Sequence, residues 1–232
     1  MVVINPDNPT GRLLTKEKME DIVIFCVENR LVLIASEVLQ DLAYSGDFIS
    51  FRKVINCMPA PYNKLELFST HSASKSNLFN SGARAGYLNT LNITPEVKNQ
   101  LYKHISMDIC SGLPGQIMMD LTLTPPSIEE GIFTHEFIQR YSASIRLSKH
   151  IHREIVLDVR DALASTKLFT FIAPKAGFTF FLNFNVNYIC DHSANRKVLM
   201  RSEPLCDIYT NQLFKEKQIL VTPGNGESLF YF

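Results

Sequence analysis

The sequence has few cysteines, and it has no excess of either charge. Its 23 basic and 23 acidic residues cancel, so composition gives no reason to expect nucleic acid or an anionic membrane as a partner. The five cysteines are scattered, odd in number and without a C-x-x-C pair, which argues against a disulfide scaffold or a zinc site. We therefore expect a protein of a reducing compartment that binds no metal and no nucleic acid.

Long apolar runs are absent as well. No stretch is long enough to cross a bilayer, and the first residues, Met1–Pro6, lack the charged start and long apolar core of a signal peptide. These first residues instead indicate a strand that begins in the middle of a fold. The 232 residues are 46% hydrophobic and 20% charged, as expected for a soluble globular protein with a sizeable core.

The first part of the chain has the pattern of a parallel α/β unit. Met1–Ile4 is a short apolar strand, and Thr15 is a helix N-cap followed by apolar residues at helical spacing, beginning with Met19. The run Leu31–Ala35 is apolar throughout, which predicts a strand buried on both faces. Strand, helix and strand joined by short links favour a mainly parallel sheet.

The sequence changes character near Pro125, and we place a domain boundary there. Before it we expect strands at Leu65–His71 and Ala85–Asn89 and a helix that starts at Thr94. After it the pattern is that of a smaller α+β layer with a long charged helix. The elements expected in this second part are a helix at Thr134–Ala164, a strand at Phe178–Phe184 with its aromatic residues in the core, a helix at Leu205–Lys215 and a strand at Ile219–Thr222.

Four short motifs contain residues suited to chemistry, and two of them stand directly after predicted strands. Taken singly, each has an ordinary interpretation as a double turn, a surface lysine or a loop. Their order and spacing together favour one common site. In chain order the motifs are Asn5-Pro6-Asp7-Asn8-Pro9-Thr10-Gly11, Ala35-Ser36-Glu37-Val38-Leu39-Gln40-Asp41, His71-Ser72-Ala73-Ser74-Lys75 and Gly82-Ala83-Arg84-Ala85-Gly86-Tyr87.

Together these motifs resemble the fold-type-I, class I/II aminotransferases, which depend on pyridoxal phosphate, and among them the alanine aminotransferase type. That type has N-P-x-N-P-T-G, A-D-E-V-Y-Q, S-x-H-S-x-S-K and G-x-R-G-G-Y in the same order. Leu113–Gln116 and Val221–Gly226 fit the pattern too, so the resemblance spans essentially the whole chain. It implies an aspartate aminotransferase-like α/β fold, with residues 1–125 forming the C-terminal part of the large cofactor-binding domain and residues 126–232 a truncated small domain.

The resemblance also assigns roles to four residues. Lys75 matches the lysine that bonds covalently to the cofactor and carries a proton during catalysis, a role that needs a reachable amine. Arg84 and Ser72 match ligands of the cofactor phosphate, which prefers a guanidinium fork and hydroxyl donors. Asn8 matches the residue that hydrogen-bonds the phenolic oxygen of the ring.

Two positions depart from the family pattern. Ser36 stands where the family has an aspartate that pairs with the protonated ring nitrogen, and losing such a group typically costs roughly 3–4 kcal/mol of barrier. Leu39 replaces a tyrosine that donates to the ring oxygen. Glu37 is no substitute for the aspartate, because the next residue of an extended chain points to the opposite face.

Parts of the family site are absent from this chain. The N-terminal half supplies a phosphate-binding turn and an aromatic that stacks on the ring, and the arginine for the substrate carboxylate is expected just after Phe232. The resemblance implies transfer of an amino group from an amino acid such as alanine to a 2-oxo acid such as 2-oxoglutarate, in a homodimer. The alternatives are a degenerate homologue without turnover and a gene fragment, and we expect no turnover from these residues alone. The expected compartment is the cytoplasm, with the mitochondrion left open because the family's N-terminal region is missing.

Overall fold

The computed structural model describes residues 1–76, 81–107, 112–127, 133–185 and 204–224. The chain divides into two compact units. The first consists of Met1–Arg160 with Ala173–Phe180, and the second of Asp161–Ile172 with Phe181–Phe232. The boundary near Pro125 was inferred from a change in sequence pattern rather than from packing, and it stays a prediction.

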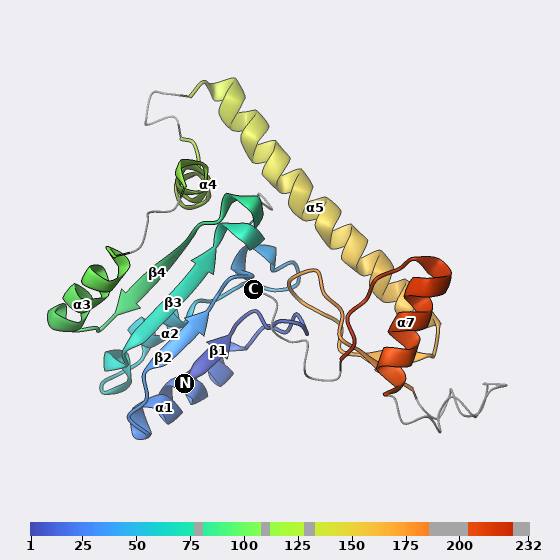
Figure 1. The fold of residues 1–232 in the computed structure, drawn as a ribbon. Helices are drawn as coiled ribbons and strands as arrows, with labels where there is room; N and C mark the ends of the chain where they lie inside the picture. Colours follow the sequence, from blue (N-terminus) through green and yellow to red (C-terminus); the bar gives the residue numbers. More distant parts are fainter. Residues whose placement is uncertain (77–80, 108–111, 128–132, 186–203, 225–232) are drawn as a thin grey trace. The chain divides into compact units, whose positions relative to one another are not determined.

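A four-stranded sheet forms the centre of the first unit (Figure 1). Its strands are β1 (Val2–Ile4), β2 (Leu33–Ser36), β3 (Leu67–Ser72) and β4 (Gly86–Leu91), in that spatial order. The first three are parallel, and β4 is antiparallel to β3. The mainly parallel α/β fold that the sequence predicts is therefore confirmed.

Helices α1 (Lys16–Glu28) and α2 (Phe51–Cys57) lie on the same side of this sheet (Figure 1). Each begins where a hydroxyl caps it: the side chain of Thr15 accepts a hydrogen bond from the amide of Lys18, and that of Ser50 accepts one from Lys53. Their apolar faces and one face of the sheet enclose the core. Its buried members are Met19, Val23, Cys26, Leu33, Ala35, Phe51, Val54, Ile55, Met58, Leu65 and Leu67.

The other face of the sheet is open in the part of the chain that the structure describes. Ile4, Ile34 and Leu88, which point to this face, are 44%, 41% and 43% exposed. The prediction that the Leu31–Ala35 strand is buried on both faces is therefore wrong. Leu33 and Ala35 are buried in the core, as the alternation of a strand predicts. No described helix covers the opposite face, to which Ile34 points.

Three more helices follow the sheet, and the last of them belongs to the first unit as far as Arg160. They are α3 (Pro95–Ile105), α4 (Leu113–Leu123) and α5 (His135–Ser165), and α3 and α5 start within a residue of where the sequence predicts. Helix α5 is the long charged helix, with the apolar residues on its predicted inner face half-buried. Helices α2 and α4 were not predicted as elements. Helix α4 packs against the short turn that contains Lys75.

The second unit is small. Strands β5 (Phe169–Phe171) and β6 (Leu182–Phe184) form an antiparallel pair, and helix α7 (Leu205–Lys217) packs Tyr209 edge-on against the rings of Phe169 and Phe184. Two predictions fail here. Only the end of Phe178–Phe184 is a strand, and Ile219–Thr222 is irregular.

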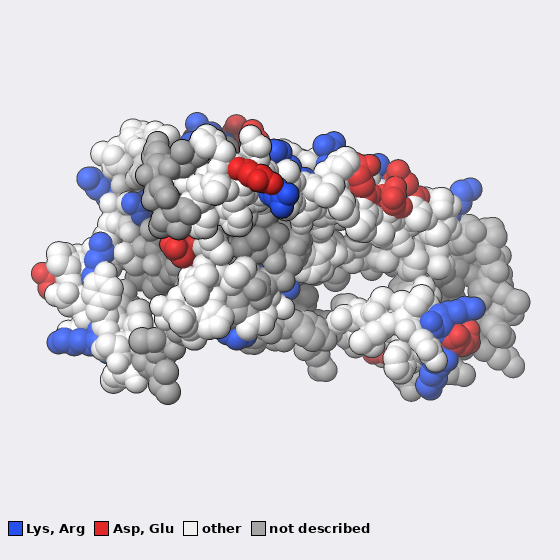
Figure 2. Space-filling view, turned by 90° about the horizontal axis from the view of Figure 1, so that it is seen from above, with Lys and Arg blue, Asp and Glu red and all other residues white. Residues whose placement is uncertain are grey.

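The surface shows no dominant charge in the view of Figure 2, where basic and acidic side chains are interspersed, in keeping with the net charge of zero. None of the described helices is long and apolar enough to cross a membrane. Within the described ranges, no three histidine, cysteine or acidic side chains gather as a metal site. Cys26, Cys57 and Cys206 are free thiols, and Cys110 and Cys190 lie outside those ranges.

Candidate functional site

The predicted motifs follow the strands at one edge of the sheet. Because β1, β2 and β3 are parallel, their carboxyl ends lie together, and this is where α/β proteins bind ligands. The backbone continues the pairing beyond the strands: the amide of Asn5 donates to the carbonyl of Ser36, and that of Glu37 to the carbonyl of Thr70, each at 3.0 Å. Three of the four motifs are thus neighbours at this edge.

Lys75 ends a short 3-10 turn, η3 (Ala73–Lys75), directly after β3. The turn is fixed at its start by Ser72, whose Oγ accepts a hydrogen bond from the amide of Ser74 at 3.2 Å. The side chain of Ala73, the first residue of the turn, is buried. Lys75 is half-buried, and its Nζ lies 4.7 Å from the centroid of the Phe178 ring. The amine is therefore held at the edge of the sheet rather than extended into solvent.

The antiparallel pairing of β3 with β4 brings the backbone of Ser72 near that of Arg84. Ser72 pairs with Gly86, and its hydroxyl donates to the carbonyl of Ala85 at 3.5 Å. Arg84 precedes that carbonyl, has a left-handed φ of 50° and is exposed. Its guanidinium donates to the carbonyl of Ser81 at 3.1 Å. The structure thus brings the two predicted phosphate ligands to one strand end, with the arginine bonded within its own turn.

Ser36 and Glu37 point to opposite faces of the sheet, as the alternation of a strand requires. Ser36 is half-buried in the row of residues on the open face. Glu37 is buried on the helix side, where Oε1 accepts a hydrogen bond from the amide of Phe51 at 2.8 Å and Oε2 accepts one from the hydroxyl of Ser69. Glu37 therefore caps α2 from the core, and its carboxylate cannot replace the one that Ser36 lacks.

This buried carboxyl predicts a pH dependence of stability that Glu37→Gln removes. Burial raises the pKa of Glu37 above its ordinary value of 4.5, against hydrogen bonds from Ser69 and Phe51 that lower it. The folded chain then holds the proton more tightly, so this contribution is fully present below pH 4.5 and is lost as the pH rises through the raised pKa. Urea denaturation at several pH values should show the unmodified chain losing stability, relative to Glu37→Gln, as pH rises above about 4.5. A constant difference across that range would contradict the assignment.

Leu39 is buried just before the turn η1 (Gln40–Leu42). A Cβ added to Gly177 would lie 3.4 Å from a methyl carbon of Leu39, so the leucine packs close against that glycine. Asn8 is exposed in the loop that follows β1. The structure therefore gives Leu39 a packing role, and it leaves Asn8 accessible at the edge of the sheet.

The segment Ala173–Phe180 returns from the far end of α5 and joins these loops. The amides of Lys175 and Ala176 both donate to the carbonyl of Gly11, at 2.8 and 3.0 Å, and the hydroxyl of Thr179 donates to the carbonyl of Pro9 at 2.7 Å. On its other side, the amide of Gly177 donates to the carbonyl of Leu42 at 3.1 Å. The segment therefore ties the first motif to Leu42 of the turn η1, the residue that follows the second motif.

Phe178 is the site residue that the sequence interpretation missed. It was expected in the core of a strand, but it precedes β6 and is 43% exposed, with its ring against the amine of Lys75. The run of aromatic residues from Phe178 to Phe184 suggested burial. Nothing local in the sequence shows that the first of them meets a lysine from the other half of the chain.

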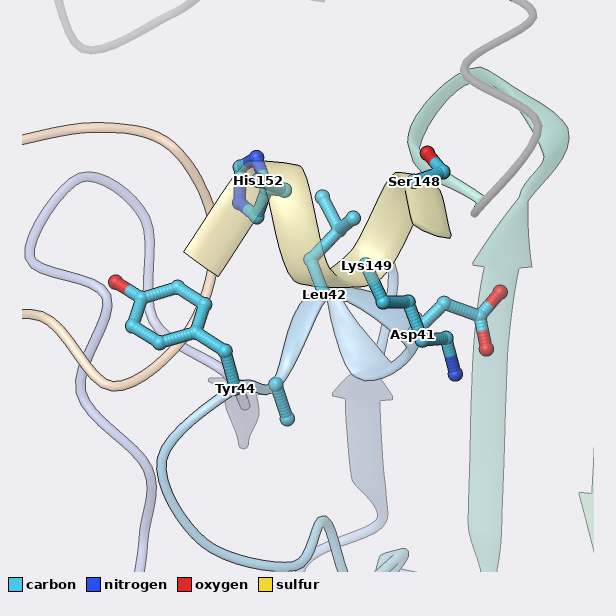
Figure 3. A pocket seen from close by; sticks show the side chains of 7 residues that line it. Asp41, Leu42, Tyr44, Ser148, Lys149 and His152 are labelled. Carbon is cyan, nitrogen blue, oxygen red and sulfur yellow. The ribbon is translucent and has the colours of Figure 1, made fainter. Parts of the chain in front are cut away.

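Two further groups lie near these motifs. His71 is buried behind the lysine turn, with Nε2 3.5 Å from Oδ2 of Asp41 and its ring 5.4 Å from that of Tyr87. A small pocket lies between η1 and α5, and Figure 3 shows it lined by Leu42, Tyr44 and His152, among others. It holds about 10 Å³, room for at most one water molecule. Burial here raises the pKa of Tyr44 to about 12.

Comparison with known proteins identifies a family. The family model described as "Aminotransferase class I and II" matches residues 1–229. The mitochondrial alanine aminotransferase 2 of Arabidopsis thaliana is 31% identical over 97% of this chain and 41% of its own length. The probable mitochondrial alanine aminotransferase of Dictyostelium discoideum is 43% identical over 54% of this chain and 24% of its own length. The chain thus spans less than half the length of these relatives.

Solved structures show the same fold. The alanine aminotransferase from Pyrococcus furiosus superimposes with a TM-score of 0.70 at 18% identity, over 94% of this chain and 47% of that one. At that identity the likeness concerns the fold alone. The sequence comparisons carry the assignment to a family.

Proposed function

Because this chain belongs to the class I and II aminotransferase family, we propose that it forms the lysine-bearing half of a pyridoxal-phosphate site for amino-group transfer. The substrates we propose are an amino acid such as alanine and a 2-oxo acid such as 2-oxoglutarate. The observation that carries the proposal is the convergence of three family motifs at one edge of the sheet, with the amine of Lys75 among them.

The residues present fit two ends of the cofactor. An aldehyde needs a reachable primary amine, and Lys75 is half-buried, without an ion pair to any carboxylate of the described ranges. A phosphate needs a guanidinium and hydroxyl donors, and Arg84 and Ser72 stand at adjoining ends of β3 and β4. Lys75 would hold the group covalently, and Ser72 and Arg84 would bind its phosphate.

The residues do not fit the third end, the ring nitrogen. Only the hydroxyl of Ser36 faces the open side of the sheet at the position concerned, and the carboxylate of Glu37 is engaged on the other side. A neutral hydroxyl carries no charge that could balance the charge of a protonated ring nitrogen. This observation favours a second candidate function, a homologue that binds the cofactor weakly and does not turn over.

The cofactor and the side chains of the protein would have different roles in the reaction. When bound, pyridoxal phosphate supplies an electron-withdrawing ring and an aldehyde that accepts an amino group. Lys75 would carry a proton at Nζ to and from the α-carbon of the substrate, because its amine is held at the carboxyl edge of the sheet. Asn8 would orient the ring through its oxygen, and Leu39 would exclude water from one side of the site, since it offers only carbon atoms.

The proposal predicts that Lys75→Ala abolishes a specific spectral change. Mixing the chain with pyridoxal phosphate should give an absorbance band shifted from that of the free cofactor, because the amine of Lys75 bonds to the aldehyde. The measurement is an absorbance titration of the unmodified chain, of Lys75→Ala and of a control, Lys64→Ala, at an exposed lysine. A band of equal size in all three would mean random modification of lysines and would defeat the proposal.

The partner and the compartment are also proposals. In the family the site lies at a dimer interface, so we propose that the whole protein acts as a homodimer. The names of the Arabidopsis and Dictyostelium relatives carry the word mitochondrial, whereas the sequence favours a reducing compartment such as the cytoplasm. Fractionation of cells that express the whole protein would decide between the two.

A further inference from the structure

The contact between Lys75 and Phe178 joins two distant parts of the first unit. The Nζ of Lys75 lies 4.7 Å from the centroid of the ring, within the range of a cation–π interaction. No carboxylate of the described ranges makes an ion pair with this lysine, so the ring face is the partner that the structure assigns to its charge.

The position of Phe178 is determined by its neighbours rather than by its own packing, since the side chain is 43% exposed. The residue before it, Gly177, donates its amide to the carbonyl of Leu42 at 3.1 Å, and its carbonyl lies 2.9 Å from Nε2 of His152 on α5. The residue after it, Thr179, donates to the carbonyl of Pro9. Both sides of Phe178 are thus anchored, which directs the ring toward Lys75. The ring of His152 also meets that of Phe178 edge-on, with centroids 6.5 Å apart.

We propose that Phe178 is a positioning residue for Lys75: it holds the charged amine in the cofactor-free chain and releases it when the amine bonds to an aldehyde. In that reaction the ammonium gives a proton to solvent, its nitrogen bonds to the aldehyde carbon, and the aldehyde oxygen leaves as water. Because the ring attracts the ammonium, the amine must leave the ring face before its nitrogen can bond to the aldehyde. The contact therefore slows capture of the cofactor while it keeps the lysine at the sheet edge. The effect on the rate of cofactor bonding rests on the proposed function, whereas the contact between Phe178 and Lys75 does not.

The expected effect is modest and measurable. A cation–π contact at a partly exposed site corresponds to about a two- to fivefold change in an equilibrium or rate. Because the attraction depends on electron density over the ring, fluorine atoms on the ring weaken it in steps with little change of shape. A residue that acted only by filling space would not respond to this series.

The test places phenylalanine with one, two or three ring fluorines at position 178 of the full chain. One readout needs no cofactor: the NMR signal of the Lys75 ε-methylene, assigned by Lys75→Arg, should be shifted upfield by the ring and should move progressively along the series. The second readout is the rate at which pyridoxal phosphate is trapped on Lys75 by borohydride, which should rise about two- to fivefold with the most fluorinated ring. The same series at Phe25, an exposed phenylalanine on α1, is the matched control and should change neither readout.

The outcomes separate the two proposals. An ε-methylene signal unaffected by the series or by Phe178→Leu overturns the contact. A capture rate that is flat along the series, with trapping intact, overturns the effect on capture while leaving the proposed function standing. No Lys75-dependent trapping in any variant defeats the proposed function instead, and the NMR readout then still decides whether Phe178 holds the lysine.

Discussion

Replacing Ser36 with aspartate is expected to tighten the binding of pyridoxal phosphate by about ten- to a hundredfold. A hydrogen bond to a charged group contributes about 1.5–3 kcal/mol, which corresponds to that range of affinity. The new carboxylate would face the open side of the sheet at the end of β2, where it could pair with a protonated ring nitrogen. Ser36 is half-buried on that face, next to the exposed side chain of Ile34.

Ser36→Asn is the matched control, because asparagine has the shape of aspartate without its charge. The measurement is an absorbance titration of both variants and the unmodified chain with pyridoxal phosphate. Adding Leu39→Tyr should give a further gain only if the tyrosine fits beside Gly177, against which Leu39 now packs. Equal affinities for aspartate, asparagine and serine at position 36 would mean that this position does not face the cofactor. The proposal that Ser36 weakens cofactor binding would then be wrong.

Gly11→Ala is expected to destabilise the chain by roughly 2–5 kcal/mol. Gly11 has a φ of +64°, where alanine costs about 1–2 kcal/mol. A Cβ at this position would also lie 2.4 Å from the carbonyl oxygen of Ala176 and 2.5 Å from Cβ of Pro174, far inside contact distance. Overpacking of this kind typically adds about 1–3 kcal/mol. The clash would push the segment Ala173–Phe180 away from the loop after β1, so Phe178 should also lose its contact with Lys75.

Gly46→Ala is the control for Gly11→Ala, because it introduces backbone strain without a steric clash. Gly46 also has a positive φ, +106°, but a Cβ there would meet nothing within 4 Å. A φ of +106° lies outside the left-handed region that L residues adopt, so backbone strain should cost alanine at least as much at Gly46 as at Gly11. Urea denaturation should still show a larger loss of stability for Gly11→Ala, because only there does the added Cβ clash. Equal losses would indicate that backbone strain alone matters and that the segment is not docked on Gly11 as described.

The sequence predicts the edge of the sheet well, because its signals there are local. A polar motif directly after an apolar run places Ser36 and Lys75 at strand ends, and parallel pairing then brings these ends together. The capping hydroxyl of Thr15 likewise fixes the start of α1 within a residue. Such features need no knowledge of distant parts of the chain.

The remaining features depend on tertiary contacts. The apolar run that includes Ile34 predicts burial on both faces, but burial depends on which helices cover the sheet. Glu37 was placed correctly on the face opposite Ser36, yet its hydrogen bond to Phe51 required α2, which was not predicted. Phe178 reaches Lys75 only because the segment around it hydrogen-bonds to loops far away in the sequence. Such pairings are set by three-dimensional packing rather than by local pattern.

The central claim is that one lysine at the carboxyl edge of the sheet captures the cofactor. Its most direct test is to reduce the chain with borohydride in the presence of substoichiometric pyridoxal phosphate, digest it and locate the modified lysine by mass spectrometry. The account predicts that the phosphopyridoxyl group is found on the peptide that contains Lys75 and is lost from that peptide in Lys75→Ala. Modification spread over exposed lysines such as Lys16 and Lys53, with Lys75 no more reactive than they are, would contradict it.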